Sequence, residues 1–140
     1  MNTRAAAAGA TAALLWAAAE PLDRRIFRCD YSDTALLGKA VSRRHWRQIG
    51  LAMHAANGAA FGLVFDVVRR RTGAKPVPLA VGMAIGENAA LWPFCALVDR
   101  YHPARGEPGV PPLLTNPRAF VQATARHALF GVALGCSPAR

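Results

Sequence analysis

The stretch HAANGAAFG, residues 54–62, is the clearest indication of the fold. It places a histidine and two glycines at intervals of four inside an apolar segment. The stretch HALFGVALG, residues 127–135, repeats this spacing. Residues four apart lie on one face of an α-helix. Each stretch therefore predicts a helix with one stripe of polar and small residues, which faces the interior of a bundle, and with apolar residues on its other faces.

Basic residues are absent from long parts of the chain, and acidic residues are few there. No Lys or Arg occurs in the 19 residues before Arg24, the 21 residues before Arg69 or the 24 residues before Arg100. A surface helix of a soluble protein needs polar positions on its outer face, whereas about 20 apolar residues cross a bilayer. The pattern predicts an all-α, transmembrane four-helix bundle. The helices are expected at about 5–25, 48–69, 77–99 and 117–137.

The first apolar segment allows two interpretations. Residues 5–19 are rich in alanine and cross a bilayer only if the helix continues toward Phe27. However, Arg4, the apolar stretch and the small residues at 17–19 also match a secretory signal peptide, which is cleaved from the mature protein. The sequence leaves both interpretations open.

The three connections differ in composition. Residues 26–47 contain leucines and arginines that predict either an amphipathic helix at the membrane interface or a solvated helix. Gly73 and Pro76 predict a tight turn, because glycine often ends a helix and proline often begins one. Residues 101–117 contain five prolines and two glycines, which predict an irregular surface loop.

The two halves of the chain share a pattern. A Leu-Trp pair is followed seven residues after the tryptophan by Asp-Arg, at Trp16 and again at Trp92. The histidine and two glycines of 54–62 match those of 127–135 at an offset of 73. We interpret this as a duplicated helical hairpin within a single membrane domain. The domain is 1–140, with repeat 1 at about 5–69 and repeat 2 at about 77–137.

Glycines spaced by four predict where the helices pack. In lipid, apolar side chains gain little by leaving hydrocarbon, so helices associate where small residues let their backbones approach closely. The alternative function of such a groove is to admit a flat ligand such as a porphyrin. The predicted helix-packing residues are Gly58, Gly62, Gly82, Gly86, Gly131 and Gly135.

Polar residues inside the apolar segments predict a polar intramembrane cluster, because an ionisable group in a membrane needs a partner. Its expected members are His54, Asn57, Glu87, His127 and Glu20. Three interpretations stay open: hydrogen bonds that stabilise the bundle, a haem or metal site, and a path for a proton or ion. His54 and His127 are candidate ligands of a haem, or of a metal together with Glu87.

Asp-Arg pairs at the ends of the first and third helices predict ion pairs at the membrane interface, or contacts with lipid headgroups. These residues are Asp23, Arg24, Asp99 and Arg100. The first and third connections hold ten basic residues and the opposite side six, Arg140 among them. Arg126 lies within a helix and is not counted. The count favours a cytoplasmic location of the first and third connections.

Other classes of protein have weaker signals. The net charge of +9 allows a soluble, basic helical protein that binds nucleic acid, but the basic residues cluster at the borders of apolar segments. No hydrolase, P-loop or dinucleotide-binding motif occurs. Cys29, Cys95 and Cys136 indicate no disulfide framework. We therefore expect a protein that is not an enzyme and needs no cofactor, with the lipid bilayer or a second copy of itself as partner and no nucleic acid.

The segments EPLDRR, HAANGAAFG, LWPFCALVDRYHP and RHALFGVALG resemble those of small bacterial inner-membrane proteins with four helices. This resemblance covers most of the chain and implies a location in the bacterial cytoplasmic membrane. It names no activity and carries over no catalytic residue. The expected function is transport or sensing of a small solute or ion through the polar cluster between the repeats. The alternative is a membrane redox protein that binds haem or a metal through His54 and His127.

Overall fold

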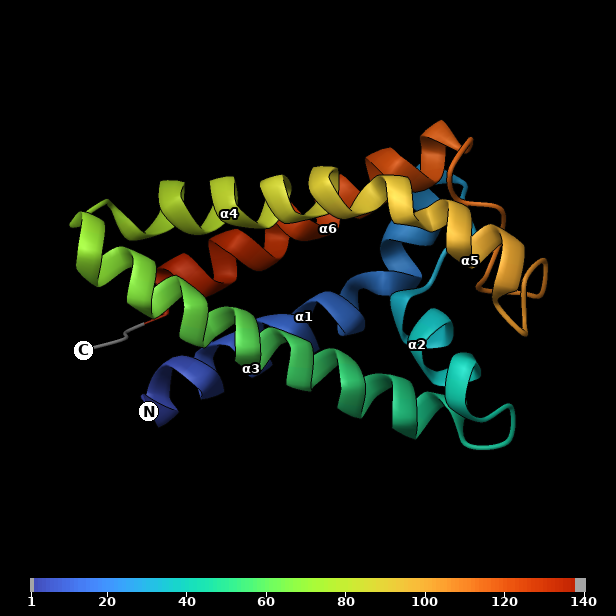
Figure 1. The fold of residues 1–140 in the computed structure, drawn as a ribbon, viewed down its shortest axis with the longest axis horizontal. Helices are drawn as coiled ribbons and strands as arrows, with labels where there is room; N and C mark the ends of the chain where they lie inside the picture. Colours follow the sequence, from blue (N-terminus) through green and yellow to red (C-terminus); the bar gives the residue numbers. More distant parts are fainter. Residues whose placement is uncertain (1, 138–140) are drawn as a thin grey trace.

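The computed structural model describes residues 2–137 and is almost entirely helical (Figure 1). In chain order the elements are α1 (Thr3–Phe27), α2 (Asp33–Val41), α3 (Trp46–Thr72), α4 (Pro76–Leu91), the 3-10 turn η1 (Trp92–Phe94), α5 (Cys95–Tyr101) and α6 (Pro117–Cys136). Within this range the only β pairing is an isolated bridge between Tyr31 and Gly109. The all-α prediction is confirmed. Arg140, which entered the count of basic residues, lies outside the described range.

The long helices form two close pairs of opposite chain direction (Figure 1). Helix α1 packs along α3, and α4 packs along α6. The two pairs meet where α1 contacts α6. The short helix α2 lies against the beginning of α3, where the backbone of Thr34 approaches Gly50. Both ends of the bundle are therefore built from segments far apart in the chain.

Three helical segments are long and apolar enough to cross a membrane. They are Thr3–Phe27, Trp46–Thr72 and Pro76–Tyr101, the last of which joins α4, η1 and α5. They match the first three predicted spans. The predicted fourth span is also a helix, α6, but it is not among these three. Its buried residues include the polar Gln122 and Arg126 among mostly small and apolar ones.

The turn between α3 and α4 is the one that the sequence predicts. Gly73 follows the last turn of α3 with a φ of 65°, a conformation that favours glycine. Pro76 is the first residue of α4. Proline suits this position because its missing N–H has no partner in the first turn of a helix.

The predicted continuous helix over 77–99 is wrong in one detail. The α-helix stops at Leu91, and a 3-10 turn over Trp92–Phe94 precedes α5. Pro93 explains the interruption, because proline removes one backbone hydrogen bond and its ring crowds the preceding turn. In the first connection, the expected helix is α2, and Ser32 caps it by accepting a hydrogen bond from the Ala35 N–H at 3.1 Å.

The outer surface of the long helices is apolar, while several polar side chains are buried. Leu15, Leu22, Ile26, Val64 and Phe94 are each more than half exposed. This distribution is unusual for a soluble protein, in which charged residues are rarely buried and large apolar patches are rarely exposed. The buried polar residues are Glu20, Ser32, His54, Asp66, Asn88, His102, Gln122 and Arg126.

Candidate functional site

Arg126 of α6 is the most deeply buried charged residue that the structure describes, with 2% of its surface exposed. Its Nε and Nη2 donate to the two carboxylate oxygens of Asp23 at 2.5 and 2.6 Å. Nη1 donates to Asp33 at 2.7 Å, and Nη2 also donates to the Tyr31 carbonyl at 2.9 Å. Every guanidinium nitrogen thus has an acceptor, and Arg126 joins α6 to α1 and to the beginning of α2.

Glu20 connects α1 to the same place. Its carboxylate accepts hydrogen bonds from the Ser32 hydroxyl at 2.7 Å and from the Asp33 N–H at 3.0 Å. The hydroxyl of Thr34 donates to it at 3.3 Å. Arg126 Nη1 lies 3.8 Å away. A carboxylate is favourable at the N-terminus of α2, because the helix dipole is positive there.

We call Arg126, Glu20, Asp23 and Asp33 the charged cluster. It contains three carboxylates and one guanidinium group, so it is negative when all four are ionised. The Tyr31 hydroxyl beside it donates to Asp33 at 2.6 Å. Burial, and then the negative charge of Asp33, raises the pKa of Tyr31 well above its usual value.

Gln122, one turn before Arg126 on α6, extends the charged cluster. Its side-chain Nε2 donates to Asp23 at 2.6 Å, and the residue is fully buried. Its Oε1 has no hydrogen-bond partner within residues 2–137. An unpaired buried acceptor costs about 1–3 kcal/mol. Gln122 is therefore a second buried polar contact between α6 and α1, in addition to Arg126.

The two predicted histidines both lie against Trp16 of α1. The ring centroids of Trp16 and His54 are 4.8 Å apart, and those of Trp16 and His127 are 4.6 Å apart. Both contacts are edge to face. The Trp16 Nε1 and His54 Nε2 atoms are buried and have no hydrogen-bond partner in the part of the chain that is described. The shared Trp16 brings together one residue from each of α1, α3 and α6.

His127 also faces Glu87 of α4. Its Nε2 lies 4.0 Å from a Glu87 carboxylate oxygen, and the Glu87 side chain is 44% exposed. The other ring nitrogen, Nδ1, is 2.8 Å from the Ala123 carbonyl. A carbonyl oxygen only accepts, so Nδ1 carries a proton. Nε2 is then available to accept a proton and to pair with Glu87.

Asn57 and Glu20 do not lie where the predicted polar cluster places them. Asn57 is exposed on α3, because the next residue, Gly58, faces α1 and successive residues are turned by about 100°. Glu20 belongs to the charged cluster. In contrast, Asn88 is buried and donates to the Thr124 hydroxyl at 3.0 Å, a contact between α4 and α6 that the sequence analysis missed.

The four residues of the predicted interface ion pairs do not pair with one another among the described residues. Asp23 pairs with Arg126, and Arg24 pairs with Asp30. Asp99 instead accepts the backbone N–H groups of residues 113 and 114 at 2.8 and 2.9 Å, and so holds the proline-rich loop. Arg100 lies over the neighbouring Tyr101 ring. The Asp-Arg motif thus has different partners in the two halves.

Two of the predicted glycine pairs are in tight contacts between helices. A Cβ atom added to Gly58 would lie 2.5 Å from the Gly9 carbonyl oxygen, and one added to Gly62 would lie 2.3 Å from that of Ala5. On α6, a Cβ at Gly131 or Gly135 would lie 2.6 Å from a backbone atom of α4. These distances are too short for any side chain.

The third predicted pair has no such contact. A Cβ atom at Gly82 or Gly86 would meet nothing within 4 Å. Helix α6 packs against one side of α4, and both glycines lie on the other, open side. The segment that contains α4 is also the least buried of the three apolar segments. The prediction that these two glycines pack against another helix of the chain is therefore wrong.

The residues described do not fit a haem between His54 and His127. The Trp16 ring contacts both imidazoles. Its centroid therefore lies less than 4.8 Å from the point midway between the two imidazole centroids. A porphyrin centred there would overlap the indole. Within residues 2–137, no group of three or more His, Cys, Asp or Glu could hold a metal ion. His54, His127 and Glu87 are not such a group.

A shallow groove lies beside the charged cluster, between α1 and α6. Its volume is about 180 Å³, and Asp23 and Arg126 lie in it. The remaining lining residues are apolar: Ala19, Leu22, Ile26, Ala125 and Leu129. The groove opens through the apolar surface of the helices, so it connects that surface with the charged cluster.

Glu20 and Asp23 of the charged cluster were candidate site residues from the sequence, but their partners Arg126 and Asp33 were not. Arg126 was set aside because it lies within a predicted span, yet a single arginine in an uncharged segment is itself a signal of a buried partner. The sequence contains no comparable signal for Tyr31, Asp33 or Gln122. Their role depends on contacts with residues 91 or more positions away in the chain. Trp16 was seen only as part of a repeat.

Comparison of the chain with protein families, with curated proteins and with solved structures found no match.

Proposed function

We propose that this chain is an integral membrane protein that is not an enzyme, and that it binds a proton or a small cation between its helices, in transport or in sensing. Two features support the membrane location. Three segments are long and apolar enough to cross a bilayer, and the large apolar side chains on their outer faces are exposed. Lipid is the solvent in which such a surface is stable.

The functional proposal rests on a series of contacts. They lead from the half-exposed Glu87 to the buried His54. Glu87 faces His127, His127 contacts Trp16, and Trp16 contacts His54. We call these four residues the polar layer. Imidazoles accept and release protons near neutral pH in water, and the buried Nε2 of His54 has no hydrogen-bond partner among the described residues. The excess of carboxylates in the charged cluster favours a cation over an anion.

Reconstitution into liposomes tests this function. We expect the purified chain to increase proton or cation flux across the membrane, measured with a fluorescent pH indicator under a potassium diffusion potential. His54→Ala removes the buried imidazole and should abolish the increase. Asn57→Ala is the matched control, because Asn57 lies on the same helix but is exposed.

Two results would contradict the proposal. One is a flux through the His54→Ala variant equal to that of the unchanged chain. The other is an equal loss in both variants, because a loss on replacing an exposed asparagine would indicate a general effect on folding or insertion. Circular dichroism in detergent monitors folding independently.

The finer architecture is part of the same proposal: a four-helix bundle of two similar hairpins, in the bacterial cytoplasmic membrane. The two helix pairs support it, because α1 with α3 and α4 with α6 each pack at glycines spaced by four. The matched tryptophans have different environments. Trp16 contacts two histidines, whereas Trp92 packs on Phe120.

A further inference from the structure

We infer that the end of the molecule formed by the first and third connections binds anionic phospholipid headgroups. This inference rests on the proposed membrane location. In addition, it states the charge of the lipid headgroups and the protein surface that binds them. We call this surface the basic face. Its residues are Arg25, Arg28, Arg44, Arg47, Arg100 and Arg118.

The arginines of the basic face are exposed, and none has an acidic partner among residues 2–137. The acidic residues at this end have other partners. Asp30 pairs with Arg24, and Glu107 pairs with Lys39 and Arg43. Asp99 accepts backbone N–H groups of the following loop. The arginines of the basic face are therefore exposed guanidinium groups without an ion pair among the described residues, and they are accessible to anions from outside.

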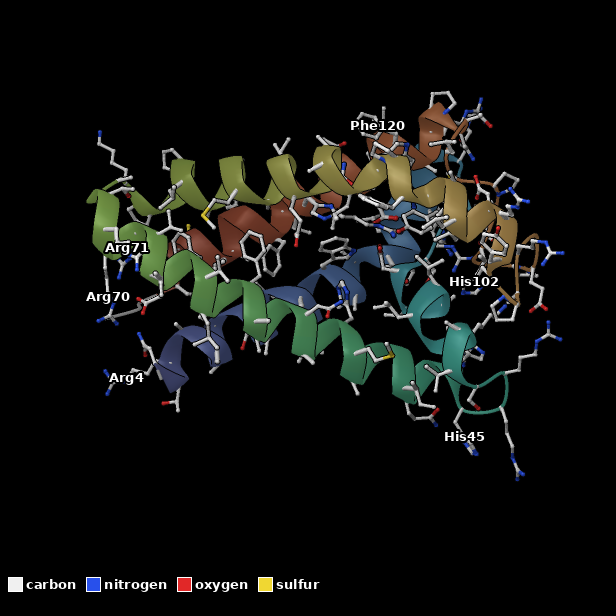
Figure 2. The ribbon with its side chains drawn as sticks, viewed as in Figure 1. Arg4, His45, Arg70, Arg71, His102 and Phe120 are labelled. Carbon is white, nitrogen blue, oxygen red and sulfur yellow. The ribbon has the colours of Figure 1, made fainter. Side chains whose placement is uncertain are left out.

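The arginines of the basic face lie in or next to four helices whose ends meet at one end of the molecule. Arg25 and Arg28 lie at or just after the end of α1, and Arg44 and Arg47 lie just before or at the beginning of α3 (Figure 1). Arg100 lies at the end of α5, and Arg118 at the beginning of α6. Figure 2 shows His45 and His102 at this end, with Arg70 and Arg71 at the opposite one. Basic residues that border membrane-spanning segments lie at the depth of the lipid headgroups.

Aromatic rings support the position of this surface at the headgroup level. The Arg47 guanidinium lies 5.2 Å from the centre of the Trp46 ring, and that of Arg100 lies 5.2 Å from the centre of the Tyr101 ring. Tryptophan and tyrosine are enriched at membrane interfaces. Guanidinium groups bind phosphate oxygens through paired hydrogen bonds. The exposed apolar side chains of Phe94 and Leu97 nearby favour lipid over nucleic acid as the source of the phosphate.

Native mass spectrometry of the full chain in detergent tests this inference with equimolar phosphatidylglycerol and phosphatidylcholine. We expect more phosphatidylglycerol to be retained. The double variant Arg44→Gln/Arg47→Gln should lower this preference by about fivefold per arginine. The control Arg71→Gln/Lys75→Gln makes the same charge change at the opposite end, and its effect should be clearly smaller.

Equal retention of the two lipids would overturn the inference, as would an equal loss in both double variants. Displacement of bound phosphatidylglycerol by a single-stranded RNA oligonucleotide at lower concentration would also overturn it and would indicate a nucleic-acid surface. The proposed membrane location fails separately, if the chain is not retained in membranes at all. A chain that stays in the membrane but shows no lipid preference contradicts the present inference alone.

Discussion

At the scale of single residues, Arg126 has the largest predicted effect on stability. Its removal leaves Asp23, Asp33 and Glu20 as three neighbouring carboxylates without a counter-charge, and breaking a buried ion pair in this way costs about 3–5 kcal/mol. We expect Arg126→Met to lower the midpoint of thermal unfolding in detergent. Circular dichroism measures this midpoint.

Arg118→Met is the control for this prediction, because Arg118 lies on the same helix but is exposed and has no acidic partner among the described residues. Equal midpoints for the two variants would contradict the role of Arg126. Arg126→Lys should give an intermediate midpoint, since lysine keeps the charge but loses the paired hydrogen bonds to Asp23.

Only part of the site could be predicted at this scale. The spacing of His54 and His127 predicts that both side chains face the bundle interior, because a periodic pattern reports which face of a helix a residue occupies, and both rings contact Trp16. The pattern carries no information about distances between helices. It therefore could not show that Trp16 contacts both histidines, or that Arg126 pairs with a residue 103 positions away.

At the scale of the helices, the glycines divide into tightly packed and open positions. Gly58→Ala and Gly131→Ala should destabilise the protein by about 1–3 kcal/mol, because each new methyl group would overlap the backbone of the partner helix. Gly82→Ala should have no such effect, since its surroundings are open. Thermal unfolding in detergent compares the three. A Gly82→Ala variant as unstable as Gly58→Ala would contradict the packing of the two helix pairs.

The helices themselves were largely predictable. Long uncharged segments, a glycine stop and a proline start located α1, α3, α4 and α6, because these signals are local. The interruption at Trp92–Phe94 was missed although Pro93 was visible, since a proline does not always break an apolar helix. The open side of α4 was also missed, because a glycine pair shows that close packing is possible and not that a partner is present.

At the scale of the whole molecule, the proposed membrane location depends on an apolar exterior around buried polar side chains. In water, exposed side chains such as Leu22, Ile26 and Phe94 would favour aggregation, whereas in a bilayer they contact acyl chains. The network of Arg126 and its carboxylates is costly to break because it is buried within the protein, where a lost partner leaves an uncompensated charge.

Extraction of membranes with alkaline carbonate distinguishes a chain that is integrated in the bilayer from a soluble one. We expect the chain, expressed in bacteria, to stay in the membrane pellet after the wash and to be released only by detergent. Recovery of a folded, monomeric chain in the carbonate supernatant, or in plain buffer without detergent, would contradict it.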